Sequence, residues 1–192
     1  MTKYNEQDND EYLLENNLLG IDSFEELERV ESFVFTLRAT AFERGDFVLR
    51  NYTKKELKQL HYYLFQDIYP FAGEFRDVQL MKGNTRFCQV QFLNDYAIEL
   101  FRQLKAEPSW RSLDEAADRL AYFKSELNML HPFREGNGRT IRIFLHAYAK
   151  SQSIEWSYEE MDSSTYMRAM TESVVNIAPL KELYLKTIGW ME

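Results

Sequence analysis

The stretch from His131 to Arg142, HPFREGNGRTIR, joins two helical patterns and gathers several chemically active residue types in one short connection. Two glycines around an asparagine allow backbone angles that other residues avoid, so several N–H groups can point into one concavity that suits an anion. The apolar spacing over residues 141–148 predicts that a helix begins here, and its positive end adds to this concavity. The stretch therefore predicts a polyphosphate-binding loop at the start of a helix.

The charged residues of this stretch fit the same ligand. Arg139 and Arg142 lie three residues apart, on one face of the predicted helix, and guanidinium groups donate in pairs to phosphate oxygens. Glu135 would repel a phosphate unless a cation lay between them, and Mg²⁺ is commonly bound by one or two carboxylates together with substrate phosphates. His131 can accept a proton near neutral pH. Each residue alone also fits an ordinary turn, core or surface position, but their joint occurrence favours a phosphate-transfer site.

The same stretch matches the signature of the Fic family, His-x-Phe-x-Asp/Glu-Gly-Asn-Gly-Arg-x-x-Arg, at every fixed position, so the chain resembles that family. The resemblance implies AMP transfer from ATP to a Ser, Thr or Tyr hydroxyl of a target protein. It also implies that His131 is the general base, that Phe133 anchors the loop in the core, and that Glu135 holds Mg²⁺.

Phosphate binding by the loop is implied in the same way. Gly136, Asn137 and Gly138 resemble the nest around the α- and β-phosphates, and Arg139 and Arg142 resemble the pair that grips the β- and γ-phosphates. One relative in the family has a lysine at the position of Gly138 and transfers the γ-phosphoryl group instead. Gly138 therefore favours nucleotidyl transfer.

Composition and charge exclude several classes of protein. The chain has 192 residues, 45% of them hydrophobic, which is enough to bury the core of a single domain. A net charge of −8 argues against direct nucleic-acid binding, which needs a broad face of Lys and Arg. The single cysteine, Cys88, excludes an internal disulfide, and we find no apolar segment typical of a signal peptide or membrane helix. These features predict a cytoplasmic protein without membrane contact.

Few glycines and prolines interrupt the chain, which predicts a mainly helical, all-α fold. Helix starts are indicated where Ser or Thr precedes Glu by three residues: Ser23/Glu26, Thr53/Glu56, Ser112/Glu115 and Ser157/Glu160. The helix after Ser112 leads directly into His131. Further helices are expected near 92–105, 157–171 and 178–187. We expect one Fic domain over 1–192, with its core at roughly 25–186 and a flexible acidic tail at 1–10.

Residues 74–92 are the exception to the helical pattern. Strand-prone residues on both sides of a Gly-Asn turn predict a short β-hairpin. Its free edge could pair with an extended segment of another protein, or the hairpin could simply cover the core. The region also resembles the flap of the Fic family, which docks the target segment by strand pairing. The predicted docking residues are Lys82, Gly83, Asn84, Thr85, Arg86 and Phe87.

Regulation is predicted from a missing motif. Many Fic proteins carry an inhibitory helix with Ser/Thr-x-x-x-Glu-Gly/Asn, whose glutamate pairs with the second arginine of the signature. Here the spacing occurs at Thr2–Glu6 and Ser151–Glu155, but Gln7 and Trp156 follow. The chain therefore resembles Fic toxins that a separate small antitoxin protein inhibits, and whose small bacterial members modify the ATPase subunits of DNA gyrase and topoisomerase IV.

Two alternatives stay open. One is a Fic enzyme that transfers a different nucleotide or phospho-group with the same base. The other is a catalytically silent module that uses the flap to hold a partner protein.

Overall fold

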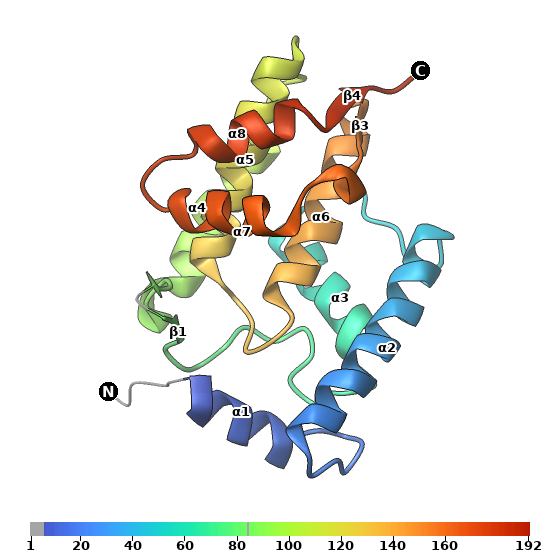
Figure 1. The fold of residues 1–192 in the computed structure, drawn as a ribbon, viewed down its shortest axis with the longest axis vertical. Coiled ribbons are helices and arrows are strands. Elements are labelled where there is room, and N and C mark those ends of the chain that lie inside the picture. Colours follow the sequence, from blue (N-terminus) through green and yellow to red (C-terminus); the bar gives the residue numbers. More distant parts are fainter. Residues whose placement is uncertain (1–5, 84) are drawn as a thin grey trace.

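A computed structural model describes residues 6–83 and 85–192 (Figure 1). The fold is mainly helical, as the sequence predicted, with two small antiparallel sheets. The helices are α1 (Glu6–Glu15), α2 (Phe24–Glu43), α3 (Lys54–Phe65), α4 (Leu93–Ala106), α5 (Leu113–Leu130), α6 (Asn137–Ser151), α7 (Ser163–Glu172) and α8 (Ala178–Leu185). The strands are β1 (Met81–Lys82), β2 (Thr85–Arg86), β3 (Ile154–Trp156) and β4 (Ile188–Trp190), and the 3₁₀ turns are η1 (Val90–Phe92) and η2 (Tyr158–Glu160).

Three of the predicted helix starts are confirmed. Ser23, Thr53 and Ser112 each accept a hydrogen bond from the backbone N–H three residues later, which begins α2, α3 and α5. The prediction at Ser157 is wrong. Ser157 precedes only the short turn η2, and α7 begins later because the Asp162 side chain accepts from the N–H of Thr165.

The N-terminal segment also differs from the prediction. Residues 6–10, predicted as part of a flexible tail, belong to α1, and residues 1–5 of that tail lie outside the described residues. Leu13 of α1 is buried, and the ring of Tyr12 lies 6.0 Å from that of Phe71. Packing against the core therefore orders this acidic helix, an effect that local composition does not reveal.

The core is built around α5, which packs against α4, α6 and α8 (Figure 1). Ala116, Ala117 and Ala121 are fully buried on α5, and such small side chains let neighbouring helices approach closely. Burial of a large apolar side chain such as Phe123 stabilises the fold by roughly 1.5–3 kcal/mol.

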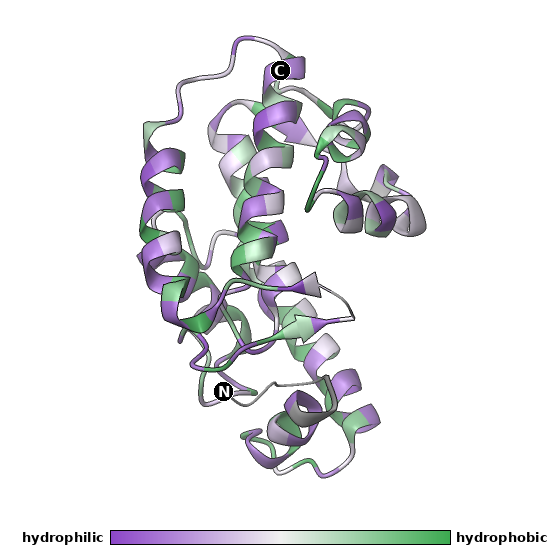
Figure 2. Ribbon diagram, turned by 90° about the vertical axis from the view of Figure 1, so that its left-hand side faces the viewer, coloured by the Kyte–Doolittle hydropathy of each residue, from purple (hydrophilic) through white to green (hydrophobic). Residues whose placement is uncertain are grey.

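The helices carry both hydrophilic and hydrophobic stretches (Figure 2). None of the helices in the described part of the chain has the length and apolar composition needed to cross a membrane.

The two sheets hold segments near the ends of α5 and α6. The predicted hairpin is present but short: Met81 pairs with Arg86, and Lys82 pairs with Thr85. Asn84, one of the predicted docking residues, lies outside the described residues. The second sheet, which the sequence did not predict, pairs β3 with β4 so that Ile154 lies opposite Trp190. It ties the C-terminal residues to the segment that follows α6.

Candidate active site

His131 ends α5 in a left-handed conformation, with φ 43° and ψ 62°, and its N–H donates to the carbonyl of Leu127 at 3.1 Å. A residue other than glycine rarely adopts this conformation, which stores strain at functional sites. The ring nitrogen Nδ1 lies 3.3 Å from the carbonyl oxygen of Asn128. Because a carbonyl only accepts, Nδ1 carries the proton in this contact and Nε2 keeps its lone pair.

The environment of His131 keeps its ring neutral. The half-buried ring stacks on Phe87 of the hairpin, with centroids 3.6 Å apart and planes 6° apart. Burial, together with the positive charge of Arg76, lowers the pKa of His131 to about 3. The predicted base is therefore unprotonated at neutral pH in the ligand-free protein.

Arg76 links the hairpin region to the loop, although sequence analysis did not single it out. This buried guanidinium donates to four carbonyl oxygens: His131 at 2.7 Å, Val78 at 2.6 Å, Cys88 at 2.6 Å and, more weakly, Leu130 at 3.4 Å. Its backbone N–H also donates to Pro132 at 2.8 Å. Arg76 thus fixes both arms of the hairpin against the end of α5.

The turn after His131 is closed by Asn137. Its side chain accepts from the N–H of Phe133 at 2.8 Å and donates to the carbonyl of Phe133 at 2.7 Å. The Asn137 side chain therefore braces the loop. Gly136 has φ 76°, and a side chain there would collide with the ring of Phe65. Only glycine fits this position without displacing the core.

The start of α6 offers unpaired backbone donors. The N–H of Thr140 donates to Gly136 at 3.0 Å, whereas we find no acceptor within the described chain for the N–H groups of Asn137, Gly138 and Arg139. The first N–H groups of a helix regularly lack partners and attract anions. A side chain at Gly138 would meet no atom within 4 Å, so the space in front of this helix end is open.

Glu135 and Arg139 face each other across the same helix end. Oε1 of Glu135 accepts from the N–H of Gly136 at 2.7 Å and from Nη2 of Arg139 at 3.2 Å. Its other oxygen, Oε2, has no hydrogen-bond partner among the described residues. Arg139 also pairs with the buried carboxylate of Glu31 on α2. Arg142, one turn further along α6, is exposed and forms no ion pair with the described side chains.

Phe133, the predicted anchor of the loop, is completely buried. It stacks on His61 of α3, with centroids 3.7 Å apart. His61 accepts from the N–H of Gly73 at Nδ1, 2.8 Å away, so its Nε2–H donates to the carbonyl of Glu135 at 2.9 Å. Burial lowers the pKa of His61 to about 4, which leaves the ring neutral in this bridge. The partners of His61 are distant in the chain, so no local sequence pattern marks this residue as part of the site.

A further charged residue lies beneath the site. Lys124 is buried on α5, two helical turns before His131 and on the same face of the helix. Burial, together with the positive charge of Arg142, lowers its pKa to about 7. The positive charge of Lys124 in turn contributes to the low pKa of His131.

Arg142 borders a pocket of about 450 Å³ between α2, α6 and the segment leading into α7. The residues that line it include Phe42 of α2, Tyr158 and Met161 of that segment, and Tyr166 of α7. On the other side of the loop, Lys82, Gly83 and Arg86 of the hairpin are exposed, whereas Phe87 is buried against His131.

The site can hold Mg²⁺ only together with another ligand. No group of three or more His, Cys, Asp or Glu side chains in the described residues could bind a metal by itself. Glu135 is 37% exposed and keeps Oε2 unpaired, which fits an ion that takes one carboxylate and several phosphate or water oxygens. The residues present therefore fit Mg²⁺ delivered with a nucleotide.

This fold and loop define a class of helical domain in which a neutral histidine ends one helix and a short loop leads to the unpaired N–H groups of the next. The chain belongs to the Fic/DOC family, whose model matches residues 51–149. It is 37% identical to protein adenylyltransferase VbhT of Bartonella schoenbuchensis over 159 residues, 82% of this chain but 33% of VbhT. It is 32% identical over 169 residues to the probable protein adenylyltransferase y4lH of Sinorhizobium fredii, with 85% of each chain covered.

Solved structures agree with this assignment of the fold. The crystal structure of BepC from Bartonella tribocorum, with bound AMPPNP, superposes with a TM-score of 0.82 at 21% identity. The match covers 92% of each chain. The fold therefore extends well beyond the residues that the family model matches.

Proposed function

We propose that this protein transfers AMP from ATP to a hydroxyl side chain of a target protein. The observation that supports the proposal is the loop itself, which joins His131, whose Nε2 has no partner among the described residues, to the unpaired N–H groups at the start of α6. Family membership and the activity in the names of VbhT and y4lH support it. The cytoplasm, where ATP and protein targets are abundant, is the proposed site of action.

In the proposed reaction, Nε2 of His131 takes the proton of the target hydroxyl. The hydroxyl oxygen attacks the α-phosphorus, the bond from that phosphorus to the bridging oxygen breaks, and pyrophosphate leaves. The loop N–H groups, Arg139 and Arg142 bind the phosphates, so most of the catalysis is orientation and charge neutralisation. The low pKa of ligand-free His131 makes it a weak base, but nearby phosphate charges would raise this pKa.

Glu135 is the proposed ligand of Mg²⁺ through Oε2, and the ion would neutralise phosphate charge when bound.

The hairpin is the proposed docking site for the target. Its two strands pair only with each other in the described chain, so an extended segment could add along a free edge. Because Phe87 stacks on His131, a segment on the hairpin would lie near the base.

Labelled ATP tests the reaction. The protein is incubated with bacterial lysate and ATP labelled at the α- or γ-phosphate, with His131→Ala as the control. We expect label on a target band from α-labelled ATP only, and none with His131→Ala. Label from γ-labelled ATP would instead indicate phosphoryl transfer. Failure of every labelled nucleoside triphosphate to modify any protein would favour the silent binding module.

We further propose that a separate small protein inhibits the enzyme, as in a toxin–antitoxin pair. Arg142 is exposed beside the pocket next to α2, and a carboxylate of a partner could occupy this position and exclude the γ-phosphate. Glu155, in one of the two inhibitor-like spacings, is exposed on β3, and Thr2 lies outside the described residues. Co-expression with the product of the neighbouring gene should give a complex and relieve toxicity. Absence of both would contradict this proposal.

Type II topoisomerases are the proposed targets. Purified ATPase subunits of DNA gyrase and topoisomerase IV should acquire label from α-labelled ATP in the presence of the wild-type protein. If the lysate contains a labelled band but neither subunit accepts label, the target assignment is wrong while AMP transfer stands.

A further inference from the structure

Glu31 is a partner of the loop that the signature stretch does not contain. It lies on α2, 108 residues before Arg139 in the sequence, and is 7% exposed. One carboxylate oxygen accepts from Nη2 of Arg139 and the other accepts from the hydroxyl of Tyr69. Both oxygens of this buried carboxylate are therefore paired.

Burying this charge works against folding. Desolvation raises the pKa of Glu31, and the negative charge of Glu135 acts in the same direction. A buried ion pair is often no more stabilising than apolar residues of similar volume, because desolvation offsets the attraction. Stability alone therefore does not explain a carboxylate at this position. Its contact with a residue of the loop suggests a role in the site.

The contacts of Arg139 indicate what this role is. Its nitrogen Nη2 serves both Glu31 and Glu135, whereas Nε and Nη1 have no partner among the described residues. The guanidinium carbon also lies 5.2 Å from the ring centroid of Phe35 and 5.0 Å from that of Phe65. Two carboxylates and two rings thus fix the orientation of the guanidinium and leave its other donors available.

We propose that Glu31 is a positioning residue for nucleotide binding, which acts through Arg139. Resting on the proposed function, this inference assigns Glu31 two effects. It orients Arg139 before the nucleotide arrives, which lowers the entropy lost on binding. It also competes with Glu135 for Arg139, so that the Glu135 carboxylate stays available to Mg²⁺.

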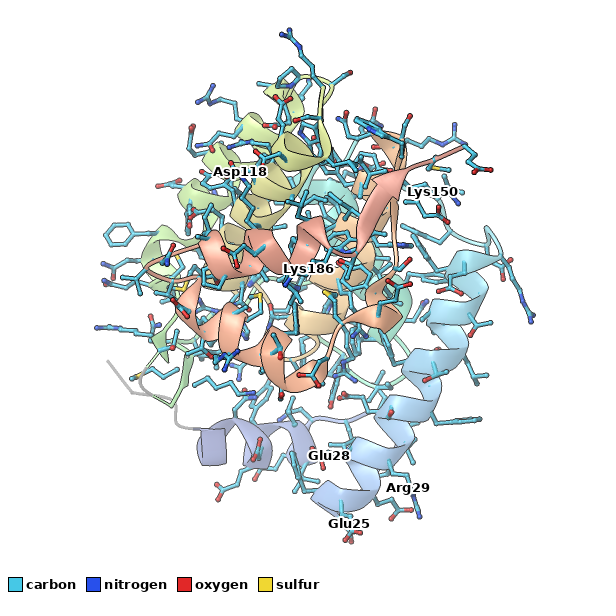
Figure 3. The ribbon with its side chains drawn as sticks, turned by 45° about the horizontal axis from the view of Figure 1, so that its top comes forward. Glu25, Glu28, Arg29, Asp118, Lys150 and Lys186 are labelled. Carbon is cyan, nitrogen blue, oxygen red and sulfur yellow. The ribbon has the colours of Figure 1, made fainter. Side chains whose placement is uncertain are left out.

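Glu31→Gln tests the inference, because glutamine keeps the size and the acceptor oxygen but removes the charge. Glu28→Gln is the matched control: Glu28 is exposed on the same helix and lies with Glu25 and Arg29 near the start of α2 (Figure 3). Binding of AMPPNP is measured while Mg²⁺ is varied, and unfolding is followed in parallel. We expect Glu31→Gln to weaken AMPPNP binding about tenfold, equivalent to ~1.4 kcal/mol, and to raise the Mg²⁺ concentration needed for half-maximal binding.

A double-mutant cycle separates positioning from a general structural effect. If Glu31 acts through Arg139, then Glu31→Gln should have little further effect on AMPPNP affinity when Arg139 is already Gln. Equal losses in the wild-type and Arg139→Gln backgrounds would overturn the inference, as would an unchanged affinity with a lowered melting temperature. The measured quantity is the affinity for AMPPNP, which does not require that the protein transfer AMP. A wild-type protein that binds AMPPNP without transferring AMP would therefore disprove the proposed function and leave this test intact.

Discussion

Lys124 shows how a single residue can make the fold sensitive to pH. Its pKa falls from an ordinary 10.5 to about 7 because the ammonium group is buried and Arg142 is also positive. Between these two pH values the unfolded chain binds more protons than the folded one, so the free energy of unfolding increases with pH. Below about pH 7 both states are protonated and the full cost of the buried charge is present.

Lys124→Met should remove this dependence. We expect the variant to be more stable than the wild type at pH 7, and the difference to shrink toward pH 10. The wild type should gain up to ~1.4 kcal/mol in the free energy of unfolding per pH unit through Lys124, and the variant should lack this gain. Urea unfolding of both proteins at several pH values measures it. Parallel stability curves for the two proteins would show that Lys124 is solvated or paired in the folded state.

The two glycines of the loop should respond differently to the same substitution. Gly136→Ala puts a Cβ into the ring of Phe65 at a φ of 76°, and we expect a loss of ~2 kcal/mol or more in the free energy of unfolding. Gly138→Ala meets no protein atom within 4 Å, so stability should be nearly unchanged while nucleotide affinity falls. Thermal unfolding and AMPPNP binding together distinguish the two. If Gly138→Ala lowered stability but left AMPPNP affinity unchanged, the open space in front of Gly138 would not be the nucleotide-binding site.

At the scale of elements, the hairpin depends on Arg76. Lysine has one nitrogen with three N–H donors, so it cannot reproduce the bonds that three separate guanidinium nitrogens make to four carbonyl oxygens. Arg76→Lys should therefore loosen the hairpin and lower AMP transfer to the target more than nucleotide affinity. Hydrogen exchange should speed up at the Cys88 amide, which donates to Met129 at 2.8 Å.

Arg44→Lys is a suitable control for that experiment, because Arg44 is exposed at the end of α2. It should leave exchange at Cys88 unchanged. If Arg76→Lys also left this amide protected, the short strand pairing between β1 and β2 would be sufficient to hold the hairpin.

The elements also show which parts of the structure could be predicted from sequence. The caps of α2, α3 and α5 depend on residues only three apart, so local patterns located them. The packing of α1 and the pairing of β3 with β4 depend on distant contacts, which no local pattern specifies. The prediction for α7 relied on Ser157 and Glu160, but the helix begins after Asp162, whose side chain provides the cap.

In the candidate site, too, the residues of one local stretch could be predicted, whereas those that depend on distant contacts could not. The loop residues 131–142 are contiguous, and a single stretch of sequence was enough to predict them. His61, Arg76 and Glu31 contact the loop across 74, 55 and 108 residues of chain, respectively. The only local sign of Glu31 is a carboxylate on the face of α2 that also carries Leu27 and Phe35, which are buried. A charge within an apolar helix face usually requires a partner, but the sequence does not identify which one.

At the scale of the whole molecule, the loop connects elements from most of the chain. Glu31 ties it to α2, His61 to α3 and Arg76 to the hairpin, while the loop itself joins α5 to α6. A nucleotide bound at the loop should therefore stabilise the domain as one cooperative unit. Ligand at a hundred times its dissociation constant adds ~2.7 kcal/mol to the free energy of unfolding.

For a domain of this size, each kcal/mol raises the melting temperature by roughly 2–4 °C. We therefore expect AMPPNP with Mg²⁺ to raise the melting temperature by about 5–10 °C in a single transition. His131→Ala should keep most of this shift, because the proposed base contributes to transfer more than to binding. Arg142→Ala should reduce the shift, because it removes a guanidinium from the phosphates. Two separate transitions, with only one of them moved by the nucleotide, would mean that the loop stabilises part of the domain and that the contacts of Glu31, His61 and Arg76 do not couple the rest.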